Sequence, residues 1–170
     1  MRSVIAFLQS PCVGDVILFQ AYAIDPRTTW VKEWPGQVVL CVSQIYWTLE
    51  VHEALKQRDG LSPFYVKLQE QMIALVGLVR GKLSKQQRIT LGALVVIDVH
   101  ARDVILEMQH KNVQSDTDFN WLAQLRYYWE DNNVYVKVIN ARVAYAYEYL
   151  GNTPRCVSEF IASDGFNRNQ

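Results

Sequence analysis

The spacing of apolar residues between positions 35 and 110 limits the fold more than any other feature of this sequence. After Trp34-Pro35-Gly36, small or apolar side chains recur every three to four residues, at Val38, Cys41, Ile45, Thr48 and Leu55. That period is the period of one face of an α-helix, and proline suits the first helical turn. The pattern predicts a helix that begins near Pro35 and ends near residues 58–60, which read Arg-Asp-Gly.

Three further segments are predicted to be helical. The second helix follows Ser62-Pro63 and has one face made of Leu68, Met72, Leu75, Val79 and Leu83. The third runs from about Lys85 to His110 and carries Leu91, Leu94, Val95, Ile105 and Met108 at compatible spacing. The fourth is predicted over FNWLAQLRYYWE (119–130), because SDTD (115–118) offers several side chains that cap a helix N-terminus.

After residue 133 the apolar period falls to two, which is the period of a β-strand. One run alternates through Val134, Val136 and Val138, and a second through Val143, Tyr145, Tyr147 and Tyr149, with a turn position at Asn140-Ala141 between them. The two runs predict a β-hairpin. The predicted fold class is therefore mainly α: an antiparallel helical bundle of about four helices followed by a C-terminal β-hairpin.

Composition and charge narrow the class of protein. Of 170 residues, 50% are hydrophobic, which is enough for one folded domain with a buried core. Lys+Arg and Asp+Glu number 17 each, so no net field draws the chain to nucleic acid or to an anionic membrane. Cys12, Cys41 and Cys156 form no C-x-x-C pair, and Ser10-Pro11 and Gly14-Asp15 interrupt the apolar N-terminal residues. We expect a soluble, intracellular chain without disulfides, signal peptide or membrane span.

Residues 77–84, GLVRGKLS, followed by LVVID at Leu94–Asp98, raise the question of a nucleotide site. A phosphate loop has the form G-x-x-x-x-G-K-[ST], follows a buried strand and opens a helix. Here only three residues separate Gly77 from Gly81, and both lie late in a helical pattern. Lys82 is followed by leucine rather than by serine or threonine. We therefore expect the end of a helix, with Lys82 placed near its negative pole.

LVVID is expected to be helical too, because helical spacing continues through both of its flanks. On a helix, Asp98 and Arg102 are i,i+4 neighbours and His100 faces Asp103, so ion pairing at the surface or between subdomains is the expected role. Asp98 and His100 point about 200° apart around a helix. The sequence D-x-H-x-x-D is therefore not expected to bind a metal.

No other motif supplies an active site. His52-Glu53 begins like H-E-x-x-H, but Lys56 stands where the second imidazole is needed. The sequence contains no G-x-S-x-G and no recognisable cysteine-nucleophile signature. Trp121, Tyr128 and Trp129 lie at helical spacing, and aromatic residues so placed are expected in the core rather than stacked on bases or sugars.

Four longer stretches, taken in order, resemble one family. They are WVKEWPGQVVLCVSQIYWT (30–48), LVRGKLSKQQRITLGALVVIDVHARD (78–103), DFNWLAQLRYYWE (118–130) and YAYEYLGNTPR (145–155). Together they are similar to the dynein heavy chains, in particular the axonemal type, over roughly Tyr22 to Arg155. The similar region is where the linker, the mechanical arm of the motor, runs into the first AAA+ module.

The resemblance implies a division of the chain and a function for it. It implies an unmatched segment (1–21), a helical linker segment (22–133), a β-hairpin leading towards the first AAA+ module (134–155) and a divergent, disordered tail (156–170). In such motors, ATP hydrolysis in the ring bends and straightens the linker and moves cargo towards microtubule minus ends. Axonemal members drive the movement of cilia and flagella.

The family's adenine-side segment and phosphate loop follow the region of resemblance, whereas this chain reads CVSEFIASDGFNRNQ after Arg155. The resemblance therefore implies a truncated fragment with no ATPase site and no cofactor of its own, ATP and Mg²⁺ being held by the parent motor. The implied partners are the rest of the motor ring and the other dynein subunits. Microtubules would be reached only through the parent, and the implied location is the axoneme.

Only mechanical and packing roles carry over to individual residues. Interhelical contacts are expected of Trp34, Trp47, Leu94, Trp121 and Trp129, and a place on the strand from arm to ring is expected of Tyr145, Tyr147 and Tyr149. Two alternatives remain open at this point. One is a free-standing helical module that binds a protein partner through apolar surface, and the other is an NTPase that uses Gly77–Ser84.

Overall fold

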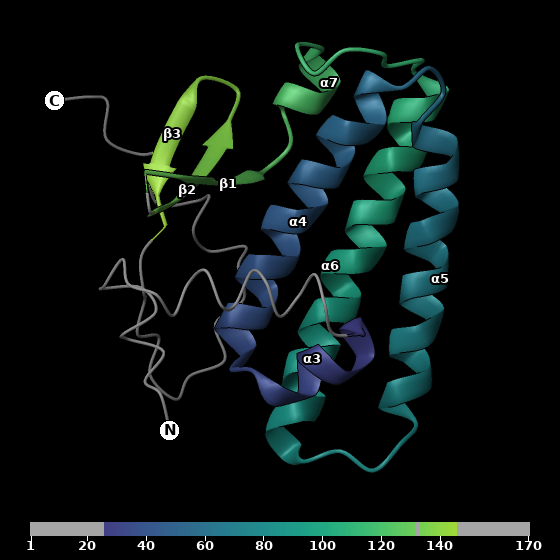
Figure 1. The fold of residues 1–170 in the computed structure, drawn as a ribbon, viewed down its shortest axis with the longest axis vertical. Coiled ribbons are helices and arrows are strands. Elements are labelled where there is room, and N and C mark those ends of the chain that lie inside the picture. Colours follow the sequence, from purple (N-terminus) through teal and green to yellow (C-terminus); the bar gives the residue numbers. More distant parts are fainter. Residues whose placement is uncertain (1–25, 132, 146–170) are drawn as a thin grey trace, which may run out of the picture.

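The computed structural model describes residues 26–131 and 133–145. Three long helices run side by side, a short helix crosses their lower end, and a small sheet lies beside the upper half of one of them (Figure 1). In chain order the elements are α3 (Arg27–Glu33), α4 (Gly36–Lys56), α5 (Leu61–Val79), α6 (Lys85–His110), α7 (Phe119–Leu122), β1 (Arg126–Glu130), β2 (Asn133–Val138) and β3 (Ala141–Ala144).

Helix α4 is the central element, because it packs against α5, α6 and β1 at once. A helix with neighbours on several sides must be apolar around most of its circumference. Its buried residues accordingly include adjacent pairs, such as Val38 with Val39 and Cys41 with Val42, rather than one stripe. Pro35 directly precedes the first residue of α4, and its carbonyl accepts the amide of Val39. The helix therefore begins where the sequence predicts.

Helices α5 and α6 form an antiparallel pair. Gln109 near the end of α6 donates to Ser62 at the start of α5, and the Arg102 guanidinium lies 3.8 Å from the sulfur of Met72. Helix α6 begins with a capping box: Ser84 accepts from the amide of Gln87, and the Gln87 side chain accepts from the amide of Ser84. This reciprocal cap satisfies two donors that a helix start otherwise leaves unpaired.

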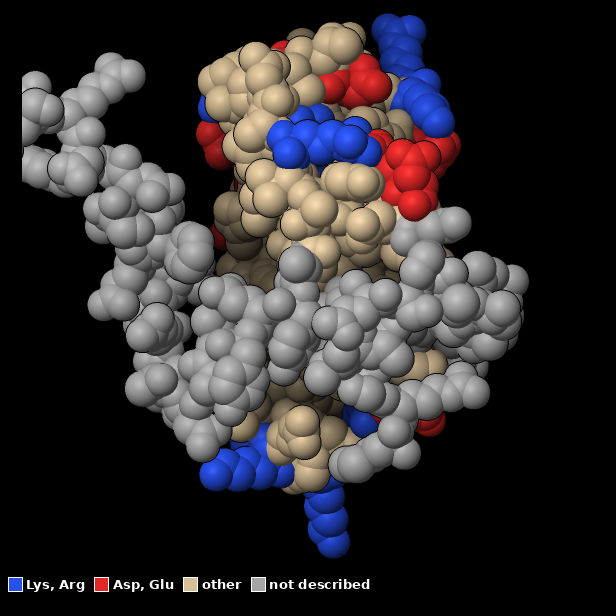
Figure 2. Space-filling view, turned by 90° about the vertical axis from the view of Figure 1, so that its left-hand side faces the viewer, with Lys and Arg blue, Asp and Glu red and all other residues tan. Residues whose placement is uncertain are grey.

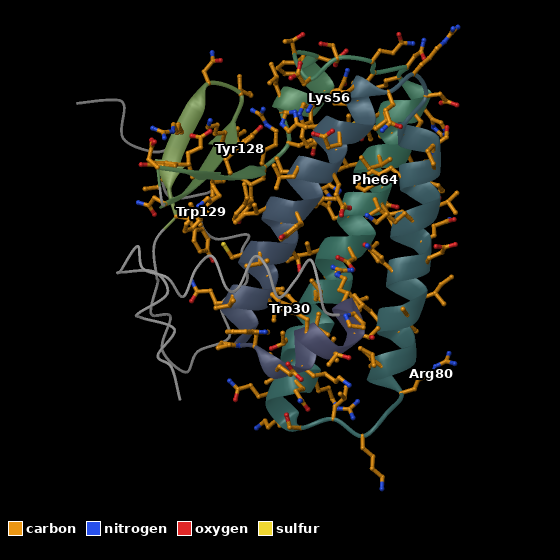
Figure 3. The ribbon with its side chains drawn as sticks, viewed as in Figure 1. Trp30, Lys56, Phe64, Arg80, Tyr128 and Trp129 are labelled. Atoms are coloured by element: carbon orange, nitrogen blue, oxygen red, sulfur yellow. The ribbon has the colours of Figure 1, made fainter. Side chains whose placement is uncertain are left out.

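The apolar core extends along the bundle as two main clusters. The upper cluster joins α4, α5 and α6 with α7 and includes Trp47, Phe64, Ile105, Met108 and Trp121. The lower cluster joins α3 to the long helices and includes Trp30, Val42, Leu75, Leu91 and Leu94. Trp30 is labelled at the lower end and Phe64 between α5 and α6 in Figure 3. The bundle is thus held together at both ends.

Close contact between α4 and α6 requires a glycine at the start of α4. A Cβ atom placed on Gly36 would lie 2.6 Å from the Thr90 hydroxyl, which is too short for any side chain. Glycine therefore allows the first turn of α4 to approach α6 directly.

The sheet is antiparallel, with strand order β1-β2-β3. Tyr127 pairs with Val136, and Val136 pairs in turn with Val143. Strand β1 packs on α4, and Ile139 at the β2–β3 turn donates its amide to the carbonyl of Leu122, 2.7 Å away. The sheet is therefore attached to the helices through β1 and through the tip of its second hairpin.

The predicted fold class is confirmed, since α3, α4, α5 and α6 are four contacting helices followed by an antiparallel sheet. The prediction of a helix over residues 119–130 is wrong. Only Phe119–Leu122 is helical there, and Arg126–Glu130 is the first strand of the sheet. The second helix ends at Val79, close to the end expected near Gly81, and Leu83 lies outside it.

Charges on the surface are mixed. Where described residues are visible in Figure 2, basic and acidic side chains stand next to one another at the upper end of the molecule. In the sheet, Glu130 pairs with both Lys137 and Arg142. Across the described residues, no helix is long and apolar enough to cross a membrane.

Candidate functional site

The candidate site is the joint between the helices and the sheet, where α4, α7 and β1 meet. We define the joint by His52 of α4, Trp121 of α7, and Arg126 and Tyr128 of β1. Tyr128 lies between the sheet and the upper half of α4 (Figure 3). Because β1 alternates its side chains between two faces, Arg126 and Tyr128 share one face of the strand.

A chain of hydrogen bonds crosses the joint. Arg126 Nη1 donates to the Tyr128 hydroxyl over 3.2 Å, and that hydroxyl lies 3.0 Å from His52 Nε2. Since a guanidinium can only donate, the hydroxyl accepts from Arg126, and its own proton is available for the unprotonated His52 Nε2. The neutral imidazole then carries its proton on Nδ1, which lies 3.8 Å from an Asp116 carboxylate oxygen.

Arg126 is a buried cation, with 5% of the residue exposed. Its Nη2 donates to the carbonyl of Leu122 over 3.2 Å, and the guanidinium lies 5.9 Å from the ring centres of both Trp121 and Tyr128. No carboxylate among the described residues lies within ion-pair distance of it. Carbonyl, hydroxyl and aromatic faces therefore take the place of a counter-ion.

Aromatic packing surrounds this hydrogen-bond chain. The rings of Trp47 and Trp121 meet edge-on with centres 5.4 Å apart, and the His52 ring meets Trp121 edge-on at 5.5 Å. Such edge-to-face pairs add to the stabilisation from burial alone. Trp121 is fully buried, so the single turn of α7 acts as a plug between α4 and the sheet.

Thr48 ties β1 to α4 through the backbone. Its hydroxyl donates to the carbonyl of Gln44 one turn earlier and accepts the amide of Tyr127 over 3.1 Å. Thr48 is fully buried, and a valine there would leave the Tyr127 amide without this acceptor. No local pattern predicts this bond, because it joins residues 79 positions apart.

Below the joint, a third apolar cluster contains Cys41, Ile45 and Val134, with Tyr127, Trp129 and Tyr145 packed against it. Burial raises the pKa of the Cys41 thiol and of the Tyr127 hydroxyl to about 12 in each case. Burial also raises the pKa of Tyr145, whose hydroxyl accepts from Gln37. These groups stay protonated at neutral pH, so Cys41 is not poised as a nucleophile.

A second polar contact attaches α3 to the middle of α6. Arg27 of α3 donates to both carboxylate oxygens of Asp98 in α6, over 2.7 and 2.9 Å. Their side chains are 15% and 11% exposed. Asp98 forms an ion pair between two elements, as expected, but with Arg27 rather than with its i,i+4 neighbour Arg102. Arg27 already holds the Asp98 carboxylate at both oxygens, whereas the Arg102 guanidinium lies 2.6 Å from Asp103.

One hollow lies at the α4–α5 connection and another beside the third cluster. A groove of about 900 Å³ is lined by the α4–α5 connection and by residues 112–114. A second, of about 380 Å³, lies between α4, α6 and β1 and includes Cys41, His100 and Tyr127 in its lining. Neither contains a cluster with the chemistry of an active site. Among the described residues, no three His, Cys, Asp or Glu side chains are grouped to hold a metal ion.

The segment 77–84 forms the end of α5, the connection that follows and the cap of α6. Gly77 lies within α5, the amide of Gly81 donates to the carbonyl of Leu78, and Ser84 caps α6. The segment therefore joins two helices, with the Gly81 amide and the Ser84 amide and hydroxyl engaged within the chain. LVVID lies inside α6, and Asp98 faces Arg27 rather than a strand end.

The structure places six of the eight residues singled out from the sequence. Leu94, Trp47 and Trp121 are buried, Trp34 packs against the lower cluster, and Trp129 and Tyr145 pack against the third cluster. Tyr147 and Tyr149 lie outside the described residues. Trp47 and Trp121 meet at the joint, whereas Leu94 and Trp34 lie at the other end of the bundle.

Comparison with known proteins gives the chain its family context. Over 148 residues, or 85% of this chain, it is 62% identical to dynein axonemal heavy chain 12 of Mus musculus. The chain is homologous to the axonemal dynein heavy chains. It is also 60% identical to dynein axonemal heavy chain 12 of Homo sapiens over the same share, and 50% identical to human dynein axonemal heavy chain 1 over 147 residues.

The homologous stretch is a small part of those proteins. It covers 5% of the mouse and human dynein axonemal heavy chain 12 and 3% of human dynein axonemal heavy chain 1. No protein-family model matches the sequence.

Proposed function

We propose that the chain is a mechanical segment of an axonemal dynein heavy chain, from the part of the linker that runs into the first AAA+ module. The observation that carries the proposal is the 62% identity over 85% of the chain. The parent motor would hydrolyse ATP and move along microtubules towards their minus ends. This segment would work in the axoneme, with the motor ring and the other dynein subunits as partners.

The architecture suits a part that transmits force. Helix α6 has 26 residues, which corresponds to a rod of about 39 Å at 1.5 Å per residue. Two neighbouring helices of 21 and 19 residues pack along it. The Arg27–Asp98 pair attaches α3 to the middle of α6, and the joint attaches the sheet to α4. A load applied to the sheet would therefore reach all three helices.

The local structure of the segment 77–84 supports a connection between helices rather than a phosphate site. The Gly81 amide is bound at the end of α5, and Ser84 caps the start of α6. ATP and Mg²⁺ would be bound by other parts of the parent motor. This chain's own residues would carry the movement and not the hydrolysis.

A test uses the whole heavy chain that contains this segment. We expect Asp98→Ala to slow microtubule gliding by a larger factor than it lowers the ATPase rate, because it loosens the arm and leaves the nucleotide pocket intact. Asp103→Ala is the matched control, since Asp103 is an exposed aspartate of the same helix. A proportional loss of gliding and ATP hydrolysis with Asp98→Ala would contradict the proposal.

A separate binding experiment tests the NTPase alternative. If Gly77–Ser84 bound phosphate, Lys82→Ala would abolish ATP binding by the isolated chain in a calorimetric titration. We expect no such binding before or after the substitution. Heat of binding that disappears with Lys82→Ala would favour the NTPase.

One observation favours a helical interaction module as the second candidate. Four apolar side chains on α5 and α6 are more than half exposed, namely Val66, Ile73, Ile89 and Val96. Exposed apolar surface of this kind often marks a contact with another protein. A defined species on size-exclusion chromatography of the isolated chain would favour a module, whereas a piece of a larger arm is expected to self-associate.

A further inference from the structure

We propose that the joint between the helices and the sheet is a proton-sensitive latch, closed when His52 is neutral and loosened when His52 gains a proton. The proposal concerns this chain's own fold and does not depend on the proposed function. It rests on the order of donors and acceptors across the joint. Arg126 donates to the Tyr128 hydroxyl, and that hydroxyl donates to His52 Nε2.

Protonation removes the acceptor on which this order depends. A protonated imidazole has N–H donors on both nitrogens. The Tyr128 oxygen would then face two donors, Arg126 Nη1 and His52 Nε2, and its own proton would need a new partner. The bond that joins α4 to β1 at this point would have to be remade or lost.

The positive charge of Arg126 adds to the free-energy cost of protonating His52. Arg126 and His52 both contact the Tyr128 oxygen, so a proton on His52 would place two cations on either side of one hydroxyl. Arg126 is 5% exposed and has no carboxylate at ion-pair distance among the described residues. Like charges at such range disfavour the charged form of the titrating group.

Of the other charged groups near His52, some raise its pKa and others lower it. Asp116, in the α6–α7 connection, attracts the proton, but its side chain is 59% exposed and its charge is screened by water. On α4, Glu53 attracts the proton and Lys56 repels it. Lys137 of β2 lies 4.5 Å from the centre of the Tyr128 ring and brings another positive charge to the joint.

The balance of these effects favours the neutral imidazole in the folded chain. Burial is the largest influence and lowers the pKa of His52 below its usual 6.5, with Arg126 and Lys56 acting in the same direction. In the unfolded chain the imidazole binds its proton at the usual pKa. Between the two pKa values the unfolded state binds more protons, so the joint loses stability as the pH falls.

Two NMR measurements on the chain test the latch. The first follows the His52 ring and the Tyr127 amide through a pH titration, because that amide binds Thr48 across the joint. We expect the amide to shift with the His52 titration, at a pKa below 6.5. The second compares hydrogen-exchange protection of the Tyr127 amide at about pH 7.5 and about pH 5, where we expect a loss of roughly two- to tenfold, the factor for one hydrogen bond.

Two histidine variants test whether His52 causes the pH-dependent loss of protection. His52→Gln should remove most of the pH-dependent loss of protection, whereas His100→Gln should leave it unchanged because His100 is exposed on α6. Titration of His52 at or above 6.5 would overturn the proposal. So would a Tyr127 amide whose protection does not change with pH, or the same change in His52→Gln. If His52→Gln does not fold, the titration of the unaltered chain decides alone.

Discussion

Replacement of Trp121 by alanine should be the most damaging single truncation at the joint. Trp121 is fully buried and contacts Trp47, His52 and Arg126. It comes from a helix of four residues, so packing of this side chain, and not helix propensity, holds α7 in place.

The size of the destabilisation follows from the apolar area that Trp121 buries and from the cavity that alanine would leave. A buried tryptophan removes about 200 Å² from water, which is worth about 5 kcal/mol at roughly 25 cal/mol per Å². Alanine keeps the Cβ atom, and none of the described residues accepts a hydrogen bond from the indole N–H, so no polar bond is lost. We expect the free energy of unfolding to fall by about 3–5 kcal/mol, and by about half as much for Trp121→Phe, which refills part of the space.

Urea unfolding followed by circular dichroism measures the loss, and thermal unfolding should show a decrease in Tm of about 10 °C or more. Phe119→Ala is the matched control, because Phe119 belongs to the same helix and is 65% exposed. Its cost should stay within about 0.5 kcal/mol. Equal effects of the two truncations, or a loss below about 1 kcal/mol for Trp121→Ala, would refute the assignment of Trp121 as the plug of the joint.

Three further predictions concern other parts of the chain. Asp98→Ala should lower the free energy of unfolding by about 3 kcal/mol, measured in urea, because it removes the two-point carboxylate contact of a largely buried Arg27; Asp103→Ala should cost less than about 0.5 kcal/mol. Ile139→Gly should raise the free energy of unfolding by about 0.5–1 kcal/mol, since Ile139 has φ of 50°, a left-handed conformation that a β-branched residue resists; a decrease would show that its side chain is needed. Cys41 should resist iodoacetamide at about pH 8 until the chain unfolds, because burial raises its thiol pKa to about 12; rapid labelling of its peptide in the native chain, seen by mass spectrometry, would contradict this.

The long helices could be predicted from the sequence because their signals are local. Apolar spacing and the positions of proline and glycine indicate where α4, α5 and α6 lie to within a few residues. The alternation of valines after residue 133 indicates β2 and β3 in the same way. Each of these patterns is complete within one segment, so no knowledge of its neighbours is needed.

The first strand could not be predicted in this way. RYYWE continues an aromatic spacing that fits a helix, but Tyr127 pairs with Val136 and Trp129 with Val134 across a hairpin. Strand preference depends on such neighbours more than helix preference does. Once β2 is available as a partner, the pairing outweighs the local helical pattern.

The contacts of the candidate site could not be predicted from local sequence patterns either. Arg27 and Asp98 are 71 residues apart, and His52 and Tyr128 are 76 residues apart. Sequence reasoning singled out Trp47 and Trp121 as packing residues, but it weighed His52 only as part of an incomplete metal motif. A histidine, an arginine and a tyrosine on separate segments give no signal until the fold brings them together.

A cryo-electron microscopy map of a whole axonemal dynein heavy chain that contains this sequence, with ATP bound, is the most direct test of the proposed mechanical role. We predict that residues 36–110 form the three packed helices within the mechanical arm, with nucleotide density elsewhere in the motor. Nucleotide phosphates in contact with Gly77–Ser84 would contradict that role, as would a position of these helices outside the arm.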